Sequence, residues 1–164
     1  DWQRLAGRKV LVDHGVQPMA MFKYACFRRA LDFKSIQAVD AGSTEKMIEA
    51  FRKGEGDYIH LQGPAPQQLE HDGGGHIVAT LGDAIGPCAF SSLAATREWL
   101  AGDMARRFMR AYRKARAWVI ASPAAEIARV EAPFFPGIDL EVLAAAIGSY
   151  QKLGNWSPHE GVQN

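Results

Sequence analysis

Apolar and polar positions along the first 66 residues repeat one pattern three times. Each repeat is a short apolar run of β type that ends in a turn rich in glycine or proline, and segments of helical periodicity separate the repeats. The apolar runs predict strands at residues 9–13, 35–40 and 57–62. Parallel strands need crossover connections of this kind, so the pattern predicts an α/β fold with a mostly parallel sheet. Its turns gather at one sheet edge, where open α/β sheets bind ligands.

The intervening helices begin and end at recognisable residues. Pro18 opens a helix predicted over residues 18–31, and Ser43 caps a second helix that ends at Gly54. A short helix after Pro66 ends near residue 71. Residues 76–81 and 88–94 predict two further strands.

From Asp103 onward the apolar residues recur at helical spacing. They predict a long helix up to Ser122, a shorter helix from Pro123 and a last helix capped by Asp139. The apolar residues of this helical half must pack against another part of the protein. That part is either the α/β half or chain not present here.

Composition and charge narrow the classes of partner. The 164 residues carry a formal charge of +1 and have a pI near 8.0, so no overall field steers nucleic acid or an acidic membrane to the chain. Two cysteines do not make a disulfide framework. No apolar run reaches about 18 residues and no leader is visible, so neither a membrane span nor a secretion signal is predicted. Because the chain begins at Asp1, a leader or longer segment removed from its front remains compatible with the sequence.

The long helix is strongly basic, which raises nucleic-acid binding as an alternative. Its aromatic residues lie on the opposite, core-type face and are not interleaved with the basic ones as a stacking platform requires. A solvated helix face is therefore favoured. No glycine-rich phosphate loop follows the first strand, which argues against a nucleotide enzyme.

Five segments, in their order and spacing, carry a family resemblance. They are residues 5–12 (LAGRKVLV), 47–58 (MIEAFRKGEGDY), 63–66 (GPAP), 90–100 (FSSLAATREWL) and 117–126 (AWVIASPAAE). Together they resemble the substrate-binding proteins of ABC importers, in the group that includes alkanesulfonate, taurine, nitrate and thiamine-pyrimidine binders.

The resemblance implies a periplasmic-binding-protein-like (type II) fold. Residues 1–87 correspond to the ligand-binding second lobe, and residues 88–164 to a hinge strand and C-terminal helices of the other lobe, whose N-terminal part this chain lacks. It further implies a periplasmic or extracytoplasmic protein without a cofactor. Such a protein binds a sulfonate, a carboxylate or a pyrimidine-like molecule between its lobes and partners an ABC permease. The expected hinges are residues 62–66 and 86–90.

The strand ends supply the candidate ligand contacts. The first helix directs N–H groups and the positive end of its dipole at its start, the second helix start offers hydroxyls, and the third strand ends in an amide and a glycine. The candidates are His14, Gly15, Val16, Gln17, Ser43, Thr44, Gln62 and Gly63. The alternative is that the glycines only make turns and that Ser43 is only a cap.

Metal binding is not expected from the histidines. His14, His60, His71, His76 and His159 include no i, i+4 pair and no ligand-type motif. Within its strand, His60 is interpreted as a structural residue whose hydrogen bonds are satisfied.

Catalysis is a second hypothesis, because the resembled fold includes a sulfinate-cleaving hydrolase and pyrimidine-forming proteins. Cys26 falls on an apolar helix face and is interpreted as a small buried hydrophobe, so Cys88 is the better nucleophile candidate. A third hypothesis is a non-catalytic interaction module, which would dimerise or capture a protein through its helical half.

Overall fold

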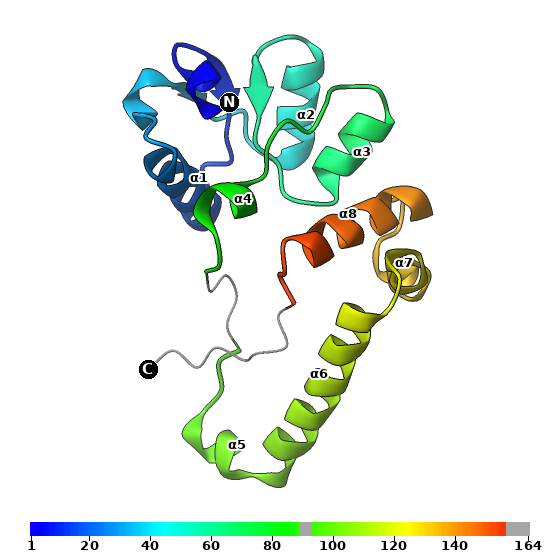
Figure 1. Ribbon diagram of the computed structural model, residues 1–164. Coiled ribbons are helices and arrows are strands. Elements are labelled where there is room, and N and C mark those ends of the chain that lie inside the picture. The colour runs from blue at the N-terminus through cyan, green and yellow to red at the C-terminus, as the bar shows by residue number, and fades with distance from the viewer. Residues whose placement is uncertain (89–92, 157–164) are drawn as a thin grey trace. The chain divides into compact units, whose positions relative to one another are not determined.

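The computed structural model describes residues 1–88 and 93–156 of the chain (Figure 1). The chain divides into two units, Asp1–Gly86 and Pro87–Asn164, here called the first and second units. None of the helices in the described ranges combines the length and apolar character needed to cross a membrane.

A three-stranded parallel sheet forms the centre of the first unit. Its strands are β1 (Lys9–Leu11), β2 (Gln37–Val39) and β3 (Tyr58–Ile59). The strand order is β2-β1-β3, and Val10 of β1 lies opposite Ala38 and Tyr58. This confirms the predicted parallel arrangement, although each strand is shorter than the apolar run that predicted it. The α/β class is confirmed with it.

Helices connect these strands. The first unit contains η1 (Trp2–Leu5), α1 (Val16–Arg28), η2 (Phe33–Ser35), α2 (Thr44–Arg52), α3 (Ala65–His71) and α4 (Leu81–Ile85). As predicted, Ser43 caps α2, because its Oγ accepts the backbone N–H of Lys46. Gly54 follows the helix in the left-handed region, with φ at 76°.

Helix α1 begins and ends earlier than the expected range of 18–31. Pro18 lies within its first turn, where a backbone N–H has no helical partner to lose. At the other end Ala30 takes a φ of 53°, and the N–H of Leu31 bonds back to the carbonyl of Cys26 at 2.9 Å. This turn stops the helix at Arg28 and returns Leu31 to the core.

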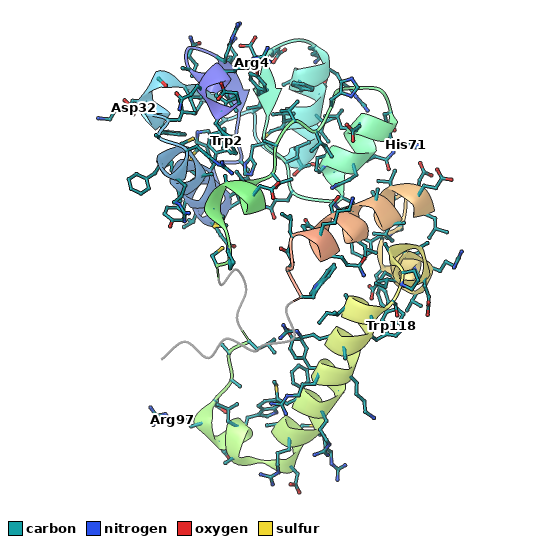
Figure 2. All side chains as sticks on the ribbon, in the orientation of Figure 1. Trp2, Arg4, Asp32, His71, Arg97 and Trp118 are labelled. Atoms are coloured by element: carbon teal, nitrogen blue, oxygen red, sulfur yellow. The ribbon has the colours of Figure 1, made fainter. Side chains whose placement is uncertain are left out.

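The core of the first unit joins α1 to the sheet. Buried Val10, Val12, Phe22, Cys26, Leu31 and Ile36 form one cluster. Trp2 of η1, labelled in Figure 2, packs on Phe22, with ring centroids 6.3 Å apart. Burial of these side chains fixes the strands, and therefore the position of the chain where the strands end.

The strand predicted at residues 76–81 is wrong. Residues 76–80 belong to no helix or strand, and Leu81 begins α4. The hydroxyl of Thr80 caps that helix at the N–H of Asp83, and Ala84 and Ile85 pack on Ala25 of α1. Of the predicted strand only Leu81 belongs to this helix, and Ile77 and Val78 are exposed. The strand predicted at residues 88–94 lies largely at 89–92, outside the described residues.

The second unit is helical over its described residues. It contains α5 (Arg97–Ala101), α6 (Asp103–Ala121), α7 (Ala124–Glu131), η3 (Ala132–Phe134) and α8 (Leu140–Lys152). The predicted long helix, the break at Pro123 and the helix start at Asp139 are confirmed. Its core is the α7–α8 pair, where Ile127 and Ala128 pack against Leu143 and Ile147.

Candidate functional site

At the carboxyl ends of β1 and β2 the chain makes the same turn twice. The Oδ1 atom of Asp13 accepts the backbone N–H of Gly15 at 2.7 Å, and the Oδ1 atom of Asp40 accepts that of Gly42 at 2.9 Å. An aspartate that bonds the N–H two residues ahead forms a local turn that redirects the backbone. Each turn leads into the helix that follows its strand, α1 or α2.

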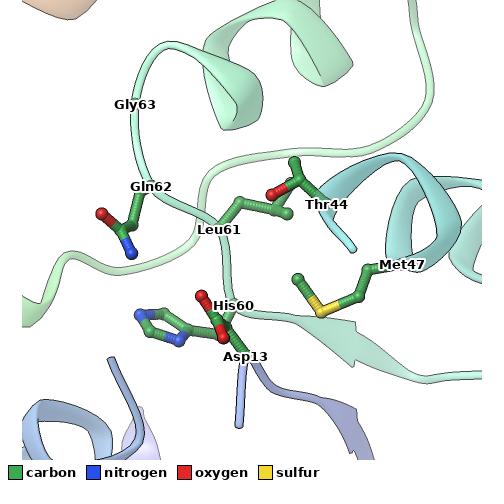
Figure 3. A pocket seen from close by; sticks show the side chains of 7 residues that line it. All are labelled: Asp13, Thr44, Met47, His60, Leu61, Gln62 and Gly63. Carbon is green, nitrogen blue, oxygen red and sulfur yellow. The ribbon is translucent and has the colours of Figure 1, made fainter. Parts of the chain in front are cut away.

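A cavity of about 280 Å³ opens at this edge of the first unit. Its lining comes from the end of β1, the first turn of α2 and the segment after β3, so the parallel topology alone brings these parts together (Figure 3). The lining residues are Asp13, Thr44, Met47, His60, Leu61, Gln62 and Gly63.

Three of the eight residues predicted from the sequence line this cavity. They are Thr44, Gln62 and Gly63. The other five flank the same sheet edge without lining the cavity, and their contact with a ligand stays a prediction. These five are His14, Gly15, Val16, Gln17 and Ser43.

At the start of α1, where an anion was expected to bind, the turn after β1 already occupies one backbone N–H donor. The N–H of Gly15 donates to Asp13, so a carboxylate of the protein itself occupies that donor. His14 turns toward β2: its Nδ1–H donates to the Val12 carbonyl at 2.7 Å and lies 4.0 Å from Oδ2 of Asp40. Val16 is 92% exposed.

The sequence analysis missed four lining residues. Asp13 follows directly after a predicted strand, and that position at a parallel sheet edge was a usable signal. Met47 belongs to the apolar stripe of α2, is 1% exposed, and forms an apolar wall together with Leu61. For Met47 and Leu61, no sequence signal distinguishes a side chain that lines a cavity from one in the ordinary core.

His60 is the fourth, and its interpretation as a satisfied structural residue is wrong. It lies one residue beyond β3, its ring packs on Phe22 with centroids 5.4 Å apart, and its buried Nδ1 has no hydrogen-bond partner in the described part of the chain. Its backbone N–H donates to the Leu11 carbonyl at 2.8 Å, which fixes the residue beside β1.

Burial also decides the charge of this imidazole. It lowers the pKa of His60 below the usual 6.5, while the nearby Asp13 carboxylate opposes the shift. His60 is therefore mostly neutral at pH 7. The Asp13 carboxylate is then the charged side chain of the cavity lining.

The cavity offers hydrogen-bonding groups and an apolar wall, but none of the thiols weighed as nucleophiles. Cys26 is buried in the core, where desolvation raises the pKa of its thiol, and Cys88 is exposed; neither lines the cavity. Among the described residues, no cluster of three or more His, Cys, Asp or Glu side chains is placed to hold a metal ion. This chemistry suits binding of a small polar molecule.

Comparison with known proteins gives one curated relative. A protein of Bacillus subtilis (strain 168) named "Putative binding protein YtlA" is 29% identical to this chain over 162 residues, which make up 96% of the chain and 48% of that protein. The chain therefore spans about half the length of this relative. No family model matches the chain, and no solved structure matches it significantly.

Proposed function

We propose that this chain is part of a solute-binding protein and that it holds a small molecule at the carboxyl edge of its parallel sheet without altering it. The observation that carries the proposal is the cavity lined from the end of β1, the start of α2 and the segment after β3. The similarity to a protein named as a binding protein supports a binding role in general.

In this proposal the protein serves an ABC import system on the periplasmic or extracytoplasmic side, and it delivers its ligand to a permease. The supports are the five segments that resemble that family and the parallel sheet expected of its lobes. The first unit then acts as the ligand-binding lobe of a type II periplasmic-binding fold.

Ligand binding is coupled to closure of two lobes in such proteins. Ligand contacts present only in the closed form stabilise that form over the open one. Gln62 and Gly63 line the cavity and also begin the proposed hinge at residues 62–66, so one segment would both contact the ligand and bend. The second proposed hinge, residues 86–90, extends outside the described residues at 89 and 90.

The ligand classes expected from the resemblance are sulfonates, carboxylates and pyrimidine-like rings. A thermal-shift screen of the full-length protein against these classes tests the function, because a ligand that binds only the folded state raises the Tm. We expect at least one class to raise the Tm with no product formed. Failure of every compound in a broad solute screen would contradict the proposal.

A matched pair of variants locates the binding. Gln62→Ala removes an amide from the cavity lining and should reduce the ligand-induced rise in Tm. Gln37→Ala removes the same group from the start of β2, at the opposite sheet edge, and should leave the rise unchanged. Equal effects of the two variants would place the ligand elsewhere.

No specific observation favours the enzyme hypothesis, since its nucleophile candidate, Cys88, does not line the cavity. Turnover of a screened ligand, lost on Cys88→Ser, would nevertheless establish it. Dimerisation through the helical half remains a prediction, checked by the molar mass of the full-length protein in solution.

A further inference from the structure

The charge of the cavity lining restricts the ligand further than the family resemblance does. Of the seven lining residues, Asp13 carries a formal charge, no lysine or arginine is among them, and His60 is mostly neutral at pH 7. The remaining groups are the neutral hydrogen-bonding side chains of Thr44 and Gln62, an apolar wall and a glycine. Among the side chains that line the cavity, the charged one is thus the negative Asp13.

The Asp13 carboxylate is held in place. Its Oδ1 accepts the N–H of Gly15 at 2.7 Å, and its half-buried side chain lies beside the His60 ring (Figure 3). No Lys, Arg or His of the described residues forms an ion pair with it. One carboxylate oxygen thus fixes the turn, and the other can accept from a ligand, since within residues 1–88 and 93–156 it has no recorded hydrogen bond.

Resting on the proposed function, we infer that this pocket takes ligands that present a protonated amine, an amidine or ring N–H groups to Asp13, and that it discriminates against sulfonates and carboxylates. A cationic donor forms a charge-assisted hydrogen bond with the carboxylate. An anion in the same pocket meets like-charge repulsion, which partial burial strengthens because the local dielectric is lower. At the start of α1 the Gly15 N–H is already bonded by Asp13, so this donor is not offered to an anion.

The pocket walls agree with a ligand that combines a charged head with an apolar body. Met47 and Leu61 supply the apolar surface, while Gln62 and Thr44 can each donate and accept hydrogen bonds. Small aromatic compounds of one ring but opposite charge are therefore suitable probes.

The first experiment compares four such probes on the full-length protein by thermal shift and isothermal titration calorimetry. Benzamidine and 4-aminopyridine present N–H donors, whereas benzoate and benzenesulfonate are anions on a comparable ring. We expect the two donors to raise the Tm and to bind at least tenfold more tightly than the anions. Tighter binding of the anions overturns the inference and leaves the proposed function standing. If none of the four binds, this inference fails, and the broad solute screen decides separately on the function.

The second experiment uses two chemically matched variants. Asp13→Asn keeps an oxygen for the Gly15 N–H but removes the charge from the pocket, and we expect at least a tenfold loss of benzamidine affinity. Asp40→Asn makes the same change in the equivalent turn after β2, whose aspartate bonds Gly42 but does not line the cavity. We expect that variant to bind benzamidine within about twofold of the unaltered protein. Equal losses in both variants would contradict a direct role for Asp13.

A third variant covers the case in which Asp13→Asn does not fold. Gln62→Lys places a positive charge at an exposed position of the lining. We expect it to weaken benzamidine binding and to strengthen benzoate binding. Unchanged affinity for both probes would overturn the inference.

Discussion

Gly56 tests how tightly β3 is held against β1, and hence how the cavity is assembled. A Cβ atom at this position would lie 2.7 Å from Cγ of Leu11 and 3.2 Å from each of its two Cδ atoms. Leu11 is 1% exposed at the centre of the sheet. Because the closest contact is with the branch carbon, rotation of the two methyl groups does not relieve it.

We therefore expect Gly56→Ala to destabilise the first unit. Overpacking of a buried site costs about 1 to 3 kcal/mol. The lower entropy of alanine in the unfolded chain returns about 0.4 to 1 kcal/mol, since Gly56 does not have a positive φ. The difference of these two effects is a net loss of about 0 to 2.6 kcal/mol, with a midpoint of about 1.3 kcal/mol. Exposed Glu55→Ala next to it should change the stability by less than about 0.5 kcal/mol.

Rescue by a second substitution identifies the clash as the cause. Leu11→Ala alone should cost about 2 to 5 kcal/mol, because it leaves a cavity in the core. In Leu11→Ala/Gly56→Ala the new methyl group enters that cavity, so the double variant should be more stable than the sum of the two losses by about 1 kcal/mol or more.

Native-state hydrogen exchange followed by mass spectrometry measures these losses in the first unit alone. The reporters are the Val12 N–H, which donates to Val39, and the His60 N–H, which donates to Leu11. Amides buried in a sheet exchange through the larger openings of their unit, so their rates give its free energy of opening. Strictly additive losses, or a Gly56→Ala variant more stable than the parent, would refute the packing of Gly56 on Leu11.

Four further predictions concern single groups. The pKa of His60 in the folded protein lies below its unfolded value of 6.5, so the unfolded chain binds the extra proton. The stability of the fold should therefore fall as the pH drops through 6.5, and His60→Gln should reduce that fall. Urea unfolding midpoints measured between pH 8 and pH 5 will show both effects. Ser43→Ala should lower the stability of the first unit by about 1 kcal/mol through loss of the α2 cap, and Ser43→Asp should not, when both are compared by chemical denaturation. Leu143→Ala should destabilise the α7–α8 pair by about 2 to 5 kcal/mol, read from the exchange of α8 amides. A disulfide reagent should label exposed Cys88 in the native protein and buried Cys26 only after unfolding; rapid labelling of both would contradict the burial of Cys26.

The parallel sheet could be predicted because its signals are local. Alternation of apolar runs with helical segments, glycine and proline at the turns, and the Ser43 cap each act within a few residues. The failed strand at residues 76–81 shows the limit. Its apolar run suits a strand, but residues 76–80 belong to no helix or strand, and Ile77 and Val78 are exposed. The pattern alone does not show whether a neighbouring strand is available for pairing.

The site was only partly predictable for the same reason. Thr44, Gln62 and Gly63 follow from the rule that ligands meet the carboxyl edge of a parallel sheet. Whether His60 is satisfied depends on which atoms surround its Nδ1, and the importance of Asp13 depends on the missing positive charge in the lining. Both are properties of three-dimensional neighbours that chain spacing does not encode.

Hydrogen exchange of the full-length protein with and without the best ligand of the solute screen tests the binding site most directly. If the ligand occupies the cavity at the carboxyl edge of the sheet, protection should increase together at the peptide that contains Asp13, at residues 44–47 and at residues 60–63, because the cavity draws on all three parts. Protection that spares these segments and appears only elsewhere in the protein would contradict the account.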